Sequence, residues 1–289
     1  MSSSISSSDS NKFPKTILFV RHAESAYNAF KFSPINWLTL RALRDPMIFD
    51  PPLSPKGVKQ LIQLGDLMEH HKILEKAEII IASPLIRAID TAMAVMGKKF
   101  NPALNKKQAE KDKKIAAEAK KVTETAATSE TSQQQTQQPP PAAADSMDSA
   151  SSTILSSSHF PVPILISPLC TEILDTSADI GSSPAELVKN YPLIDFSELK
   201  ESWWYYEGEN PRSITDEPKQ KVAERVKQFK EFIAARPETF LVIVTHSSFI
   251  KHCTGAKTKI PNCAVQECEM ENSSNEWKIK VKKTRLTIS

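Results

Sequence analysis

Three short apolar runs, each followed at once by polar residues, constrain the fold of this 289-residue chain more than any other feature. The runs are Thr16–Val20, Glu78–Ala82 and Phe240–Val244, each about five residues long and rich in Ile and Val. Runs of this length and composition are typical of strands that are buried in a parallel sheet. We therefore expect these segments to be buried strands.

Helical patterns lie between and after these runs. Gly57–Glu69, Leu85–Met96 and Pro218–Ala235 repeat apolar residues at the spacing of a helix that buries one face. A further apolar segment, Val162–Ile166, precedes the last of these helices. Strands that alternate with helices predict an α/β domain with a mostly parallel sheet.

Charged and polar residues follow the predicted strands. Arg21 and His22 follow the first run, Arg87 comes shortly after the second, and His246 comes just after the third. Ligands of such sheets gather at the carboxyl ends of the strands. Arginine presents a permanently charged fork to phosphate oxygens, and histidine can act as nucleophile, acid or charge stabiliser. The set therefore predicts a site for a phosphate-like oxyanion.

Cleavage of a phosphoester also needs a proton donor for the leaving oxygen. Glu172, which follows the apolar segment Val162–Leu169, is the candidate. Asp175, Asp179 and Glu201 lie close to it in the sequence and are weaker candidates.

Composition excludes several other classes of protein. The chain has six glycines, no two closer than eight residues, which excludes the glycine-rich dinucleotide and P-loop motifs and the nucleophile elbow. A net charge of +3 is too small to indicate a nucleic-acid partner. The basic run at 278–285 alternates with apolar residues, as on an exposed strand face.

The cysteines and the apolar segments indicate the cellular compartment of the protein. Four cysteines form no CxxC pair and no zinc spacing, and a reduced intracellular compartment is therefore expected. We also expect no metal and no other cofactor. The cysteines are Cys170, Cys253, Cys263 and Cys268. The sequence has no apolar N-terminal leader and no membrane-spanning run. We expect a cytoplasmic protein, with the nucleus as an alternative, and no membrane partner.

Two segments have compositions that do not support a packed core. Residues 1–12 are Ser-rich, and about 101–158 changes from Lys/Ala/Glu to Ser/Thr/Gln and then to Pro/Ala/Ser. Segments with so few large apolar residues cannot offset the entropy cost of ordering. We expect a disordered tail, and one domain at 13–289 that is interrupted by a disordered insert.

Five motifs occur in order outside the tail and the insert. They are RHAESAYN at 21–28, LSPKGVKQ at 53–60, SPLIRAIDTA at 83–92, LCTEI at 169–173 and VTHSSFI at 244–250. Together they resemble the motifs of the histidine phosphatase superfamily, in its phosphoglycerate-mutase-like branch. The branch that resembles acid phosphatases fits less well, because Ser25 and Ser247 replace its Arg and Asp. The resemblance implies a three-layer α/β/α sandwich.

The resemblance also implies a function, a phosphomonoester hydrolase that forms a phosphohistidine on His22. By position in the motifs, Arg21, Arg87 and His246 bind the phosphoryl group. Glu172 protonates the leaving oxygen and then activates water.

Two further residues are expected substrate contacts. Asn28 matches an asparagine that helps to bind the phosphoryl group in the family. Ser247 and Ser248 replace a usual Gly pair, and their backbone N–H groups could serve the phosphate at a helix start.

Several alternatives remain open at this point. The chain could be a phosphoglycerate-type mutase that depends on bisphosphoglycerate, or a module that binds a phospho-ligand with weak activity. Its substrate could be a small phosphorylated molecule or a phosphoprotein, and its oligomeric state cannot be read.

Individual side chains outside the motifs are also open to interpretation. The aromatic cluster at 203–206 with Arg212, and the segment Phe30–Asp50 with Trp37, Arg41 and Arg44, could each be a substrate lid or a packed edge. The remaining residues of interest are expected to be structural or solvated, namely the Glu224–Arg225 pair, His70, His71, His159 and His252.

Overall fold

The computed structural model describes residues 14–39, 45–101, 160–273 and 276–286. The tail predicted at 1–12 and the insert predicted at about 101–158, apart from its first residue, lie outside the described residues. Arg41, Arg44 and His159 also lie outside them.

In the described part of the chain, six strands form one sheet in the order β3-β2-β4-β1-β5-β6. They are β1 (Lys15–Arg21), β2 (Ile79–Ala82), β3 (Ile164–Ile166), β4 (Phe240–Thr245), β5 (Val265–Ser273) and β6 (Glu276–Leu286). The four strands β3, β2, β4 and β1 run parallel to one another. The strand β5 is antiparallel to its neighbour β1, and β6 is antiparallel to β5. The prediction of a mostly parallel sheet is confirmed, and the three apolar runs form the adjacent strands β2, β4 and β1.

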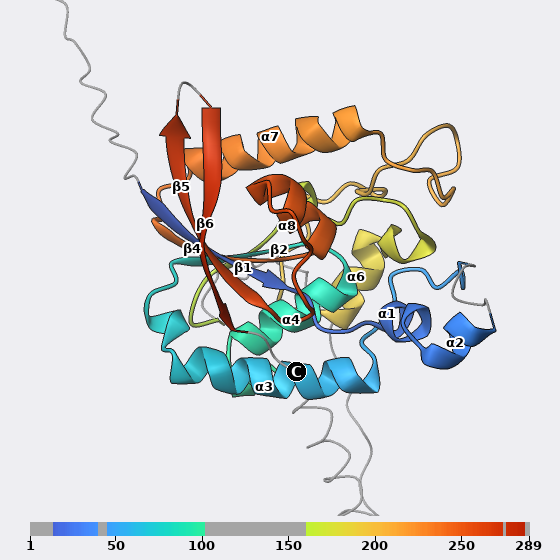
Figure 1. Cartoon of the computed structure of the whole chain (residues 1–289), viewed down its shortest axis with the longest axis horizontal. Coiled ribbons are helices and arrows are strands. Elements are labelled where there is room, and N and C mark those ends of the chain that lie inside the picture. The colour runs from blue at the N-terminus through green and yellow to red at the C-terminus, as the bar shows by residue number, and fades with distance from the viewer. Residues whose placement is uncertain (1–13, 40–44, 102–159, 274–275, 287–289) are drawn as a thin grey trace, which may run out of the picture.

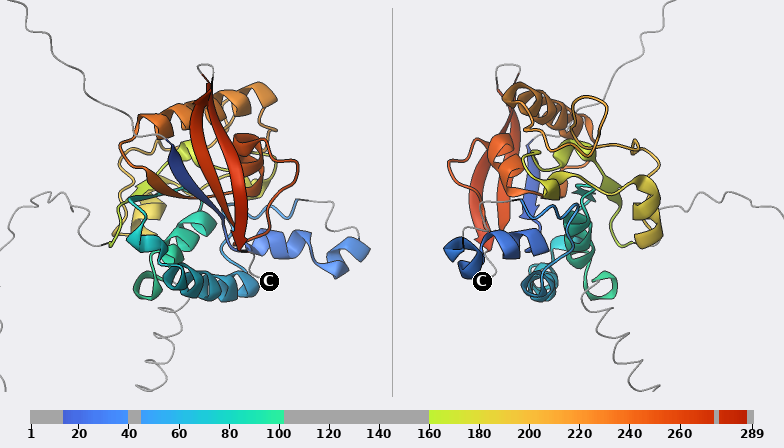
Figure 2. Two further views of the ribbon diagram at one scale, coloured as in Figure 1. Left: turned by 60° about the vertical axis from the view of Figure 1, so that its left-hand side comes forward. Right: turned by 90° about the vertical axis from the view of Figure 1, so that its right-hand side faces the viewer.

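Helices cover both faces of this sheet. The helices α3 (Pro55–His70) and α4 (Ile86–Val95) pack on one face, and α7 (Lys219–Ala235) and α8 (Ser247–Thr254) pack on the other (Figures 1 and 2). The smaller helices are α1 (Ala26–Lys31), α2 (Pro34–Leu38) and α6 (Pro184–Asn190), with 3₁₀ turns at Ile73–Glu75, Lys98–Phe100, Pro168–Cys170 and Ser177–Asp179. The predicted three-layer α/β/α arrangement is confirmed. Among the described residues, no helix is long and apolar enough to cross a bilayer.

The domain has two apolar cores, one on each face of the sheet, and the two-residue period of a strand explains how β1 contributes to both. Along β1, Leu18 and Val20 point into the core under α3 and α4, whereas Ile17 and Phe19 point into the core under α7 and α8. All four side chains are fully buried. A strand buried on both faces has to be apolar at every position, and this is why β1 reads as a continuous apolar run.

The basic run at 278–285 lies on the edge strand β6. Lys280 and Lys282 are exposed and form ion pairs with Glu271 and Glu269 on the neighbouring strand β5. Charged residues on an edge strand discourage pairing with other chains. The prediction of an exposed strand face is confirmed for these lysines.

Phe100 and Phe160, which lie far apart in the sequence, are neighbours beside the core. The rings of Phe100 and Phe160 lie 5.1 Å apart between centroids. The buried side chain of Asn101 donates from Nδ2 to the carbonyl of Leu61 on α3, at 3.0 Å. Both ends of the segment that joins residues 101 and 160 are therefore held beside the core.

The start of α3 is fixed against the loop that follows β1. Ser54 donates from its backbone N–H to the carbonyl of Glu24 at 2.9 Å, and the side chain of Gln60 accepts from the N–H of Glu24 at 2.9 Å. Gly57 allows this approach, because an added Cβ would lie 2.0 Å from the Glu24 carbonyl oxygen. The motif at 53–60 thus holds the backbone two residues after His22.

We expect Gly57→Ala to lower the free energy of unfolding by at least about 2 kcal/mol, because the new methyl group overlaps fixed backbone. Gly65→Ala on the same helix is the matched control. Its Cβ would lie 3.3 Å from the carbonyl oxygen of Ala94, so we expect a change within about 1 kcal/mol. Urea denaturation of the two variants measures both values. Equal stabilities would contradict the close approach at Gly57.

Candidate active site

A cavity of about 420 Å³ lies at the carboxyl ends of β1 and β4. It contains Arg21, His22, Arg87 and Glu172, which the sequence places after three separate strands. The full lining consists of Arg21, His22, Ser25, Tyr27, Asn28, Lys31, Phe32, Arg87, Glu172, Asp175, Thr176, Ala178, Asp179, Ser247, Ser248, Lys259, Ile260 and Pro261. The prediction that these charged strand ends meet is therefore correct.

His22 is held as a neutral base. Its Nδ1 lies 2.6 Å from the carbonyl oxygen of Ala23, and because a carbonyl can only accept, Nδ1 carries the proton. The other ring nitrogen, Nε2, is then left with a free lone pair. Burial lowers the pKa of His22 well below its ordinary value of 6.5, and the charges of Arg87 and Arg21 lower it further. A buried, neutral imidazole with a free Nε2 is a competent nucleophile.

His246 lies against His22, outside the set of side chains that line the cavity. The centroids of the two rings are 4.9 Å apart, and His246 Nε2 lies 2.8 Å from the hydroxyl oxygen of Ser83. Burial, followed by the charge of Arg87, lowers the pKa of His246 well below 6.5. Its Nδ1 is buried and has no hydrogen-bond partner among the described residues. The sequence placed His246 in the phosphate pocket, whereas in the structure its ring packs beside His22 and is not among the side chains that line the cavity.

The two arginines are anchored by the protein, with N–H groups to spare. Arg21 donates from Nη1 to the carbonyl of Ile260 at 2.7 Å, and its buried Nε has no partner in the described structure. Arg87 donates from Nη1 to the carbonyl of Ala178 at 2.6 Å and from Nη2 to Asp179 at 3.0 Å. A guanidinium has five N–H donors, so both can still bind an anion.

Asp179, which the sequence offered only as a weaker candidate for the proton donor, is the ion-pair partner of Arg87. Its buried carboxylate pairs with Arg87 and accepts from the hydroxyl of Thr176 at 2.8 Å. Burial raises the pKa of Asp179, although the charge of Arg87 acts in the opposite direction. Its place beside Arg87 depends on a loop without periodicity, so no local pattern reveals this pairing.

Glu172 bridges its own loop and the start of α8. Its carboxylate accepts backbone N–H bonds from Ile173 at 3.0 Å, Ser248 at 3.3 Å and Phe249 at 3.1 Å. A negative charge is favourable at this end of a helix. The amide of Ser248, which the sequence offered as a phosphate donor, is used by Glu172 in this structure.

The serines that replace the usual Gly pair cause no backbone strain. Ser247 and Ser248 open α8 in helical conformation, and neither is among the non-glycine residues with positive φ. Ser247 lines the cavity, as expected.

Arg225 fixes the loop that carries Glu172. It donates to the carbonyls of Thr171 at 2.8 Å and Leu169 at 3.3 Å, and it pairs with the buried Glu217 at 2.7 Å. Glu224 instead pairs with Lys221 at the surface. The expectation that Glu224 and Arg225 are solvated or structural is therefore confirmed, with Glu224 at the surface and Arg225 directed inward to the loop.

Asn28 lies in the wall of the cavity, as predicted. Its Oδ1 accepts from the N–H of Ser25 at 3.4 Å within the capping box that starts α1. Asn262, which the sequence did not indicate, lies beside it and donates from Nδ2 to the carbonyl of His22 at 2.9 Å. This amide ties the β5 side of the site to the nucleophile.

The aromatic cluster is a packed edge, and it does not line the cavity. Trp203 and Trp204 are buried with Leu85, and their indole N–H groups donate to the carbonyls of Ser182 and Pro211. The guanidinium of Arg212 lies 5.5 Å from the ring centroid of Phe49. Of the other open segment, Phe30–Asp50, two residues line the cavity, Lys31 and Phe32, and Trp37 is exposed.

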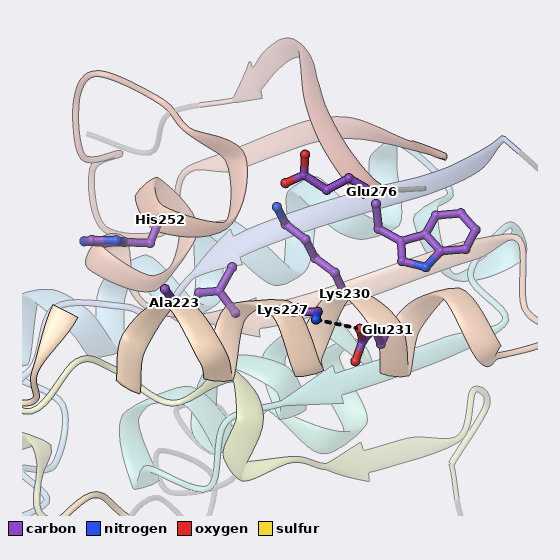
Figure 3. A pocket seen from close by; sticks show the side chains of 8 residues that line it. Ala223, Lys227, Lys230, Glu231, His252 and Glu276 are labelled. Atoms are coloured by element: carbon purple, nitrogen blue, oxygen red, sulfur yellow. Dashed lines mark ion pairs between the residues drawn. The ribbon is translucent and has the colours of Figure 1, made fainter. Parts of the chain in front are cut away.

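A second cavity, of about 390 Å³, lies between α7, α8 and β6 (Figure 3). Its side chains include Lys227 and Glu231, which form an ion pair at 3.8 Å, and Lys230, His252 and Trp277. None of the motif residues that carry charge at the strand ends lies in it. We therefore place the chemistry in the first cavity.

Comparisons with known proteins agree with the motifs. The family model described as histidine phosphatase superfamily (branch 1) matches residues 17–152. An Arabidopsis thaliana protein named "Phosphoglycerate mutase-like protein" is 27% identical over 267 residues, which cover 89% of this chain and 83% of that protein. A second Arabidopsis thaliana protein, "Phosphoglycerate mutase-like protein 1", is 25% identical over 243 residues, covering 84% and 71%. The solved structure of a mycobacterial glucosyl-3-phosphoglycerate phosphatase has 12% identity and a TM-score of 0.46, covering 94% of this chain and all of that chain.

We expect the imidazoles of His22 and His246 to be neutral at pH 6, where an ordinary histidine is mostly protonated, because the pKa of each lies well below 6.5. Nitrogen chemical shifts of labelled histidine, followed from pH 5 to pH 8, measure the two titrations. His22→Ala and His246→Ala assign the signals. A midpoint near pH 6.5 for either ring would contradict the effect of burial.

We expect Arg225→Met to lower the free energy of unfolding by about 3–5 kcal/mol, because it leaves the buried carboxylate of Glu217 unpaired. Chemical denaturation measures the loss. The double variant Arg225→Met/Glu217→Leu should recover most of it, since no buried charge remains. Glu224→Gln is the control, with a change within about 0.5 kcal/mol. A loss as large in the control would contradict the assigned pairing.

Proposed function

We propose that this chain, a member of the histidine phosphatase superfamily, hydrolyses phosphomonoesters through a phosphohistidine on His22. The observation that carries the proposal is the hydrogen bond from His22 Nδ1 to the carbonyl of Ala23, 2.6 Å long. It leaves Nε2 unprotonated in a cavity that also holds Arg21 and Arg87. A neutral nucleophile between two cations fits a phosphoryl group, whose negative charge the guanidinium groups offset.

The first step transfers the phosphoryl group to the protein. Nε2 of His22 attacks phosphorus while the bond from phosphorus to the leaving oxygen breaks. Glu172 gives its proton to that oxygen, so the product leaves as a neutral alcohol. Arg21 and Arg87 stabilise the charge on the remaining phosphoryl oxygens, and Asp179 and Ala178 hold Arg87 in place for this role.

The second step releases phosphate. Glu172, now ionised, accepts a proton from a water molecule, whose oxygen attacks phosphorus. The bond between phosphorus and His22 Nε2 breaks, and the free lone pair is restored. The backbone bonds from Ser248 and Phe249 support the ionised carboxylate between the two steps.

Asp179 is the alternative proton donor. It lines the same cavity, and burial raises its pKa, which favours the protonated form. The pairing of Asp179 with Arg87 favours a positioning role, and we therefore assign the proton transfer to Glu172. Separate substitution of the two carboxylates distinguishes them.

The test is phosphate release from a panel of phosphomonoesters in the presence of EDTA. We expect wild-type turnover that persists in EDTA and disappears in His22→Ala. Glu172→Gln should lower kcat by about 10²–10⁴-fold, the usual contribution of a general acid. Asp179→Asn should lower kcat less than Glu172→Gln does, and the reverse order would move the proton donor to Asp179.

Two outcomes would contradict the proposed hydrolase activity. Isomerisation of a phosphoglycerate that depends on bisphosphoglycerate, without net phosphate release, would make the chain a mutase. Binding of a phospho-ligand without turnover, unchanged in His22→Ala, would make it a binding module. Loss of wild-type turnover in EDTA would contradict a reaction that needs no metal.

A further inference from the structure

Large apolar side chains are exposed together on a segment beside the catalytic cavity. Phe32 is 65% exposed, Ile35 69%, Trp37 52% and Leu38 85%. They belong to α2 and to the residue that ends α1, and we call residues 32–38 the apolar arm. The two helices project from the side of the domain (Figures 1 and 2). Four large apolar side chains exposed within seven residues are a candidate binding surface, because soluble domains rarely leave apolar groups clustered in water.

The arm continues a wall of the catalytic cavity. Ser25, Asn28, Lys31 and Phe32 line that cavity, and their spacing places them on one side of α1. This side begins three residues after His22 and ends at Phe32. Phe32 therefore belongs both to the cavity and to the exposed apolar arm.

The start of α1 is fixed in place. The N–H of Ala26 donates to the carbonyl of Pro52 at 2.8 Å, and Ser25 and Asn28 form a capping box. The side chain of Asn36 on α2 donates to the carbonyl of Phe30 at 2.9 Å, which joins the two helices. The direction from the nucleophile to the arm is therefore set by hydrogen bonds.

The cavity combines charged and apolar side chains. Arg21, Arg87 and Glu172 line it beside His22. Its apolar lining includes Phe32, at the end of α1, and Ile260 and Pro261 of a second segment. A ligand whose phosphate lies at His22 can therefore contact Phe32 with an apolar part.

We propose that the substrate is a phosphomonoester whose alcohol part is a large apolar group, and that this group lies against Phe32 and the apolar arm. The inference rests on the proposed function, since it places the phosphate on His22. Transfer of the apolar group from water onto the arm stabilises the bound state in proportion to the area covered. This binding selects substrates by the size and apolarity of the alcohol.

A series of unbranched alkyl phosphates tests the inference, because ethyl, butyl, hexyl and octyl phosphate differ only in apolar length. The assay is phosphate release at concentrations below those at which octyl phosphate forms micelles. We expect kcat/KM to rise about fourfold for each two methylene groups, the gain for a chain covered on one side. From ethyl to octyl phosphate the gain would be on the order of 50-fold.

The double variant Ile35→Ser/Leu38→Ser tests the position of the alkyl chain. Both side chains are mostly exposed, so the variant should fold. We expect the ratio of kcat/KM for octyl to ethyl phosphate to fall at least about fivefold, with kcat/KM for ethyl phosphate unchanged. Val188→Ser/Leu193→Ser is the matched control, because these residues are about half exposed and do not line the cavity.

The outcomes separate this inference from the proposed function. No phosphate release from any member of the series or of the wider panel would overturn the hydrolase itself. Release with the same kcat/KM from ethyl to octyl phosphate would overturn only the apolar substrate. If kcat/KM is the same across the series and the protein is a dimer that Ile35→Ser/Leu38→Ser dissociates, the arm binds a second copy of the chain. A flat series with binding of the protein to phospholipid vesicles would assign the arm to a membrane surface.

Discussion

The parallel pairing of β1 with β4 is the constraint on which the rest of the site depends. It places Arg21 opposite Thr245, and the N–H of His22 donates to the carbonyl of Thr245 at 3.0 Å. Since both strands end at the same level, His22 and His246 leave the sheet side by side. A shift of the register by one residue would turn every side chain of β1 to the other face and would separate the two rings.

The charges of the site are balanced by groups that do not react. Asp179 and a backbone carbonyl hold Arg87, a carbonyl holds Arg21, and helix amides hold Glu172. The histidines remain neutral because burial disfavours the charged imidazole and because protonation would place a further positive charge next to Arg87 and Arg21. The site is thus assembled before substrate binds, so that little reorganisation remains for the reaction.

The parts of this structure that local patterns encode could be predicted from the sequence, and the parts that depend on tertiary distance could not. The apolar runs and helical periods predicted the central strands and the main helices, and the motifs predicted Arg21, His22, Arg87 and Glu172 of the cavity. The pairing of Asp179 with Arg87, the contacts of Asn262 and the pairing of Arg225 with Glu217 could not be predicted, because loops bring these residues together from distant positions. The packing of Trp203 and Trp204 likewise depends on which residues their loop covers, and the periodicity of the sequence carries no information about this.

The meeting of Phe100 and Phe160 has a consequence for how the length of this chain can vary. Because the core fixes where Phe100 and Phe160 lie, their separation does not depend on how many residues join them. The strand β3, which follows Phe160, therefore keeps its place beside β2 whatever that number is.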